Sequence, residues 1–160
     1  MRTVAERATG LGDAVRRAGE LSVRTVIIDI EPLVSHWNGT QETLDEGIAR
    51  VLGEIAKLPT VEVVCFSTNS LRRPSVVPST AGVQVVYLAS AGKPLRTTQY
   101  QRFPRPGVVI GDQVGTDGIL ARRLGYAFIQ FDPPAGRPVG PRLMAAAGRL
   151  VQPLLFTEAG

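Results

Sequence analysis

The chain has 160 residues, of which 44% are hydrophobic and 20% charged, and its formal net charge is +4. This length suits one domain with its own core, and the composition excludes an intrinsically disordered chain. The single cysteine, Cys65, excludes an intrachain disulfide framework or thiolate metal cluster, while the positive charge favours an anionic partner.

The first segment is predicted to be a basic helix. Apolar residues recur every three or four positions over residues 1–19, with arginines between them. We therefore divide the chain into an N-terminal helix at residues 1–22 and a single α/β domain at residues 23–156. Arg16 and Arg17 would allow this helix to touch an anionic membrane surface. Because the sequence has neither a signal-peptide core nor a run of about 18 apolar residues, we expect a cytoplasmic protein.

Strands that alternate with helices predict the rest of the fold. The expected strands are apolar runs at residues 24–30, 61–67, 83–88, 108–110 and 127–131. The expected helices lie at residues 43–57, at 96–103, through Ile119, Leu120 and Leu124, and at 142–155. Thr116 or Asp117 could cap the third helix, and Gly125 could end it. This alternation is typical of an α/β fold with a three-layer, Rossmann-like, doubly wound parallel sheet.

The run at residues 24–31 ends in two carboxylates, Asp29 and Glu31. Side chains two residues apart in an extended chain share a side, so these two should emerge together where the strand ends. Chemistry in open α/β sheets lies beyond the carboxyl ends of the strands. An acidic pair at that edge suits a metal ion and an attacking carboxylate.

Polar residues also follow the next three strands. They are Ser67, Thr68 and Asn69 after the second strand, Lys93 after the third, and Asp112 with Asp117 after the fourth. A carboxylate can attack phosphorus, and a second acid can protonate the leaving alcohol. A hydroxyl and a lysine can hold phosphoryl oxygens, and further carboxylates suit Mg²⁺. The set indicates phosphoryl chemistry, although each residue alone could simply end a strand or cap a helix.

The ordered set resembles the motifs of the haloacid dehalogenase (HAD) superfamily. That pattern is D-x-D-x-T after the first strand, Ser or Thr after the second, a later Lys, and G-D-x-x-x-D after the fourth. The corresponding runs here are D-I-E-P-L from Asp29, S-T-N from Ser67, G-K-P around Lys93, and G-D-Q-V-G-T-D from Gly111. The likeness spans residues 24–134 and is greatest to small capless phosphatases related to phosphatidylglycerophosphate phosphatases.

The resemblance implies a role for each position. Asp29 would be the nucleophile and a metal ligand, and Glu31 the general acid and base, whose backbone carbonyl would also bind Mg²⁺. The phosphoryl group would be bound by Ser67, Thr68, Asn69 and Lys93. Asp112 and Asp117 would complete the metal site. We expect a Mg²⁺-dependent phosphomonoesterase that forms an aspartyl-phosphate, and the lack of room for a cap domain favours a large, lipid or macromolecular phosphate.

Three residues depart from the family pattern. Glu31 replaces the usual second Asp and moves the acid by over about 1 Å, a misplacement that can cost about 100-fold in rate. Leu33 replaces the usual Thr, and Pro32 stiffens the loop above the nucleophile. The alternative is therefore a catalytically impaired HAD-like domain that serves as a binding or regulatory module.

Other classes fit less well. A phosphoacceptor receiver domain carries its phosphorylated Asp after the third strand, where this chain has Ala89 and Ser90. A nicotinamide-binding domain needs a glycine-rich turn after the first strand, and none follows it here. Aromatic residues are too few and too poorly interleaved for a nucleic-acid stacking platform.

Overall fold

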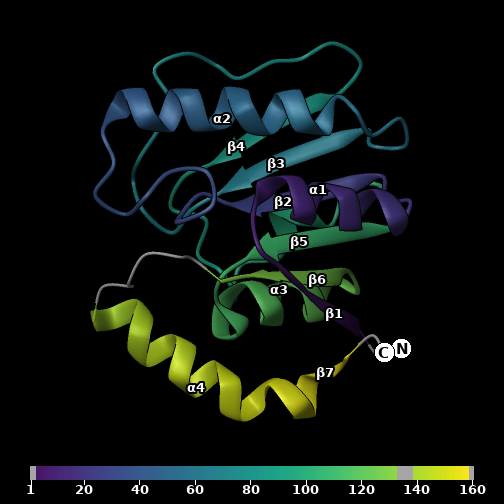
Figure 1. The fold of residues 1–160 in the computed structure, drawn as a ribbon, viewed down its shortest axis with the longest axis vertical. Coiled ribbons are helices and arrows are strands. Elements are labelled where there is room, and N and C mark those ends of the chain that lie inside the picture. Colours follow the sequence, from purple (N-terminus) through teal and green to yellow (C-terminus); the bar gives the residue numbers. More distant parts are fainter. Residues whose placement is uncertain (1–2, 133–138, 159–160) are drawn as a thin grey trace.

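The computed structural model of the chain describes residues 3–132 and 139–158. Seven strands form one sheet in the order β4-β3-β2-β5-β6-β1-β7, and neighbouring strands run parallel (Figure 1). The strands are β1 (Thr3–Ala8), β2 (Thr25–Asp29), β3 (Val63–Ser67), β4 (Gln84–Leu88), β5 (Gly107–Gly111), β6 (Ala127–Phe131) and β7 (Phe156–Glu158).

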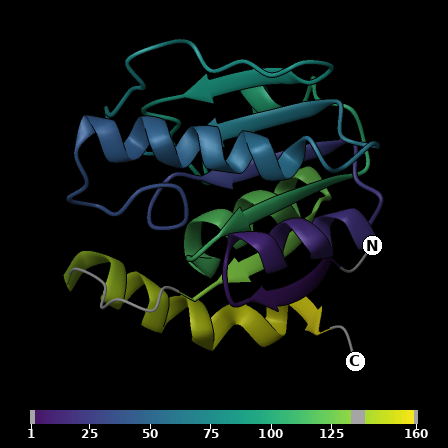
Figure 2. The same ribbon diagram turned by 45° about the horizontal axis from the view of Figure 1, so that its top comes forward.

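Helices cover both faces of the sheet, which gives three layers (Figures 1 and 2). The helical elements are α1 (Leu11–Glu20), α2 (Gln41–Ile55), the 3₁₀ turn η1 (Thr98–Tyr100), the π-helical turn η2 (Val114–Gly118), α3 (Ile119–Leu124) and α4 (Val139–Leu155). Val26 and Ile28 of β2 pack in the layer of α1 and α2, whereas Ile27 packs with η1 and α3. This alternation follows from the two-residue period of a strand. The predicted doubly wound α/β fold is confirmed.

Strand β2, which lies between β3 and β5, marks the point at which the winding reverses. The chain continues from β2 to β3 and β4 on one side, then returns to β5 and β6 on the other. The loops that follow β2 and β5 therefore diverge at the carboxyl edge of the sheet. In doubly wound sheets this divergence opens the crevice in which ligands bind.

The helix predicted over residues 1–19 is wrong in its first part. Thr3–Ala8 form β1, which pairs with β6 and β7 inside the sheet, and α1 begins only at Leu11. The buried Ala5 and Ala8 pack in the core, because tertiary pairing overrides a weak helical spacing. The three-residue strand β7 was not predicted, and the helix expected over residues 96–103 is only the short turn η1. The other expected elements are confirmed to within a few residues.

Candidate functional site

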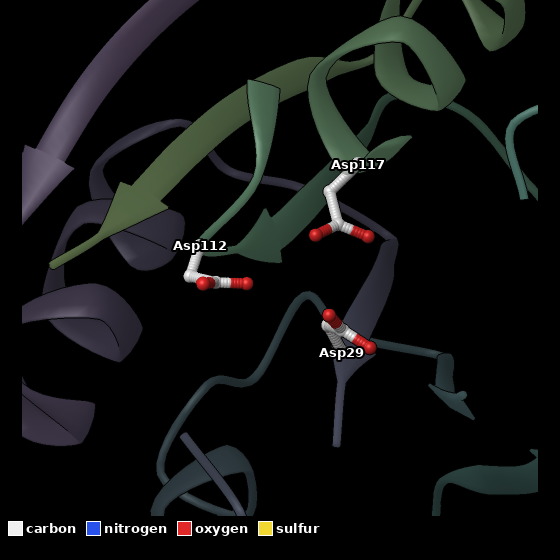
Figure 3. Close-up of side chains that lie close together, drawn as sticks. All are labelled: Asp29, Asp112 and Asp117. Carbon is white, nitrogen blue, oxygen red and sulfur yellow. The ribbon is translucent and has the colours of Figure 1, made fainter. Parts of the chain in front are cut away.

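Three aspartates from separate segments meet at the carboxyl edge of the sheet. Asp29 ends β2, Asp112 follows β5, and Asp117 lies in η2, and Figure 3 shows their carboxylates turned toward the same space. One oxygen of each lies within 4.8 Å of the others. Asp29 is 9% exposed and the other two are fully buried. This group of hard oxygen donors could hold a metal ion.

Lys93 is the cation of the site. Its Nζ donates to Asp29 Oδ1 at 2.8 Å and to Asp117 Oδ1 at 2.7 Å, and its side chain is only 2% exposed. Burial alone would lower the pKa of Lys93, but Asp117 and Asp29 outweigh it and raise this pKa. Burial and the neighbouring Asp117 raise the pKa of Asp29 well above its usual value, since Lys93 offsets them only in part.

The position of Lys93 is fixed by Asn69 in the neighbouring loop. Asn69 Nδ2 donates to the Lys93 carbonyl at 3.1 Å, and the Lys93 N–H donates to Asn69 Oδ1 at 2.8 Å. Gly92, directly before the lysine, has φ of +68°, a conformation that favours glycine. The Asn69 side chain thus joins the loops after β3 and β4.

Gly111 explains how Asp117 reaches the site. A Cβ at Gly111 would lie 2.3 Å from Asp117 Oδ2, so only glycine leaves room for this carboxylate beside the end of β5. The helix-cap prediction for Thr116 and Asp117 is wrong, because α3 begins after Gly118 without a side-chain cap. The Asp117 carboxylate instead accepts from Lys93 and from the backbone N–H of Gln113.

The structure separates Ser67 from the next residue, Thr68. The Ser67 hydroxyl is fully buried and hydrogen-bonds to the Tyr100 hydroxyl at 2.7 Å, so it belongs to the wall of the site. Thr68 is also fully buried, but it belongs to the cavity lining and donates to Glu31 Oε2 at 2.8 Å. A hydroxyl for a bound phosphoryl group is therefore better placed on Thr68 than on Ser67.

Glu31 is held apart from the three aspartates. Its carboxylate accepts from Thr68, from Ser70 at 3.4 Å and from Arg72 at 3.2 Å. The Arg72 guanidinium also donates to the Ser35 hydroxyl and to the carbonyls of residues 36 and 39, and so ties the loop after β2 to this acid. No pattern in the sequence singles out Arg72, because it lies in a loop and its partners are distant along the chain.

These residues surround a cavity of about 270 Å³. Its lining consists of Asp29, Glu31, Trp37, Thr68, Asn69, Ser70, Arg72, Lys93, Gln113 and Thr116. Asp112 and Asp117 lie beneath this lining. Asp29 is thus the member of the aspartate cluster that also faces the cavity, and the acid, the lysine and the arginine give the cavity charges of both signs.

Comparisons of the chain with protein-family models, with curated proteins and with solved structures find no match. The likeness to the HAD superfamily drawn from the motifs therefore stays a prediction. Among the helices of residues 3–132 and 139–158, none has the length and apolar character needed to cross a bilayer.

Proposed function

We propose that the chain is a Mg²⁺-dependent phosphomonoesterase of the HAD type that works through an aspartyl-phosphate on Asp29. One observation carries the proposal: Asp29 faces the cavity while its carboxylate shares a buried cluster with Asp112, Asp117 and the Lys93 ammonium. Asp29 is therefore the carboxylate that a substrate in the cavity would meet.

The charge of the cluster supports a divalent cation. Three carboxylates and one ammonium leave a formal charge of −2 when all are ionised. Buried charge of one sign is costly unless it is compensated. Asp29, Asp112 and Asp117 would hold the cation, and their oxygens are the ligands that Mg²⁺ prefers. Bound Mg²⁺ would supply a Lewis acid that neutralises charge on the phosphoryl oxygens.

The chain's own groups account for the rest of the reaction. An Asp29 oxygen attacks phosphorus, the bond from phosphorus to the leaving alcohol oxygen breaks, and water later hydrolyses the aspartyl-phosphate. Lys93 orients Asp29 through its hydrogen bond to Oδ1. Thr68 lines the cavity and can donate to a phosphoryl oxygen once its hydroxyl leaves Glu31. Glu31 would protonate the leaving oxygen and then activate the water.

The substrate class we propose is a large, lipid or macromolecular phosphate. The segments at residues 30–40 and 68–83, which follow β2 and β3, are too short to hold a cap domain above the cavity. A site without a cap leaves room for a bulky group attached to the phosphate.

The test is hydrolysis of p-nitrophenyl phosphate and of a phospholipid monoester, with Mg²⁺ or with EDTA. We expect Mg²⁺-dependent turnover that Asp29→Asn abolishes. Asp45→Asn is the matched control, because Asp45 lies on α2 outside the cluster and is held by Ser75. Turnover that survives Asp29→Asn would remove Asp29 as the nucleophile.

A second candidate is the catalytically impaired HAD-like domain that binds phosphoryl groups without turning them over. The contacts of Glu31 favour it, because Thr68, Ser70 and Arg72 all donate to this carboxylate and hold it against the loop after β3. The double change Glu31→Asp with Leu33→Thr discriminates between the two. If the natural chain is inactive and the double variant gains turnover, the natural chain is assigned the binding role.

A further inference from the structure

Three of the four leucines of helix α4 point away from the protein. Leu143, Leu150 and Leu154 are 68%, 81% and 80% exposed, whereas Gly148 and Gln152 are buried. A Cβ at Gly148 would lie 3.1 Å from the Val114 Cβ, so the backbone of α4 rests directly on η2. A helix that serves only the core does the reverse and buries its large apolar side chains. These three leucines therefore add little to the core, against which α4 packs the partly buried Leu155.

These side chains form one continuous surface. Leu143, Ala147, Leu150 and Leu154 are exposed and lie three or four residues apart, a spacing that places them on one helix face. We call these four residues the leucine stripe. Single exposed leucines need no explanation, but a contiguous apolar stripe marks an interaction surface. Figures 1 and 2 show α4 at the margin of the fold, where its outer side is open to a flat partner.

The charge beside the stripe is positive. Arg142 and Arg149 are exposed and lie seven residues apart, and the sequence between Asp132 and Glu158 contains no acidic residue. Helix α1 differs, because its arginines form ion pairs with nearby acids, namely Asp13, Glu20 and Glu6. Helix α4 thus combines exposed apolar side chains with arginines that have no acidic residue in the same stretch of sequence.

We propose that the outer face of α4 binds a bilayer surface that contains anionic phospholipids. The helix would lie in the plane of the interface, with the leucine stripe among the acyl chains and Arg142 and Arg149 at the level of the phosphates. The stripe from Leu143 to Leu154 gives a contact about 17 Å long. A second copy of the chain fits this face less well, because its α4 would bring arginines and no acid. The proposal does not depend on the chemistry at Asp29.

The test is co-sedimentation of the full chain with vesicles of phosphatidylcholine, alone or with part of it replaced by anionic phosphatidylserine. We expect binding to the anionic vesicles that weakens with added salt. The double variant Leu150→Gln/Leu154→Gln should bind about tenfold more weakly or worse. The matched control is Leu71→Gln/Leu95→Gln, at leucines that are 81% and 79% exposed elsewhere on the surface, and it should bind like the natural chain.

A charge variant gives a second, independent measurement. Arg149→Gln should weaken binding to the anionic vesicles about fivefold. Arg96→Gln removes the same charge from an exposed position outside α4 and should have little effect. Circular dichroism checks that each variant keeps its fold, which we expect because the replaced side chains are exposed.

Several outcomes would overturn the proposal. The natural chain could stay in the supernatant with anionic vesicles, or it could bind equally to both kinds of vesicle. The two double variants could also lose equal amounts of vesicle binding. Sedimentation velocity addresses self-association. A dimer that Leu150→Gln/Leu154→Gln dissociates would assign the leucine stripe to a second copy of the chain instead.

Discussion

Replacement of Lys93 by Met tests whether the buried ammonium holds the site together. Lys93 Nζ lies 2.8 Å from Asp29 and 2.7 Å from Asp117. At an effective dielectric constant of about 20, each contact is worth about 6 kcal/mol before desolvation is subtracted. Removal of one partner from a buried ionic group costs about 3–5 kcal/mol, because the remaining charge is left uncompensated. We expect Lys93→Met to lower the free energy of unfolding by this amount.

The matched control for this measurement is Lys57→Met. Lys57 also lies 2.7 Å from a carboxylate, that of Glu54, but its side chain is 66% exposed. Solvent screening limits such a pair to below about 1 kcal/mol. The assay is urea unfolding in EDTA, followed by circular dichroism. Equal losses for the two variants would refute the claim that Lys93 compensates buried charge at Asp29 and Asp117.

Three further predictions concern the same site. Gly111→Ala should destabilise the protein by about 1–3 kcal/mol, because the added Cβ would meet the Asp117 carboxylate. The control is Gly53→Ala in α2, where an added Cβ has open space. It should stabilise the protein by about 0.4–1 kcal/mol in the same urea assay. In EDTA, the free energy of unfolding should fall as pH rises through the raised pKa of Asp29, because the folded chain holds a proton there that the unfolded chain releases more readily. Mg²⁺ or Asp29→Asn should flatten this pH dependence. A flat profile in the natural metal-free chain would contradict the prediction. Arg72→Met should release Glu31 and lower any turnover about 100-fold, the cost of a misplacement of about 1 Å. Unchanged turnover would show that the Arg72 contact does not position this acid.

Much of the fold followed from local pattern. The strand β2 was predicted because an unbroken β-branched run is typical of a strand buried on both faces. The strand β1 was missed, since T-V-A-E-R-A has few β-branched residues and its spacing fits a helix as well. Its identity depends on the edge of β6, which lies more than 100 residues away along the chain.

Part of the site could also be predicted from the sequence. The meeting of Asp29, Asp112 and Asp117 follows from the rule that parallel strands bring their carboxyl ends to one edge. The contacts of Arg72 with Glu31 could not be predicted in the same way. They depend on how a loop folds back over the sheet, and no residue pattern near Arg72 specifies that path.

A crystal structure of the full chain soaked with Mg²⁺ and beryllofluoride, a mimic of a phosphoryl group, would show whether Asp29 is the nucleophile. We expect beryllium bonded to an Asp29 carboxylate oxygen, with Mg²⁺ held beside it by Asp29, Asp112 and Asp117. Beryllofluoride bound away from Asp29, or a cation held elsewhere while Lys93 keeps Asp29 and Asp117 unchanged, would contradict it.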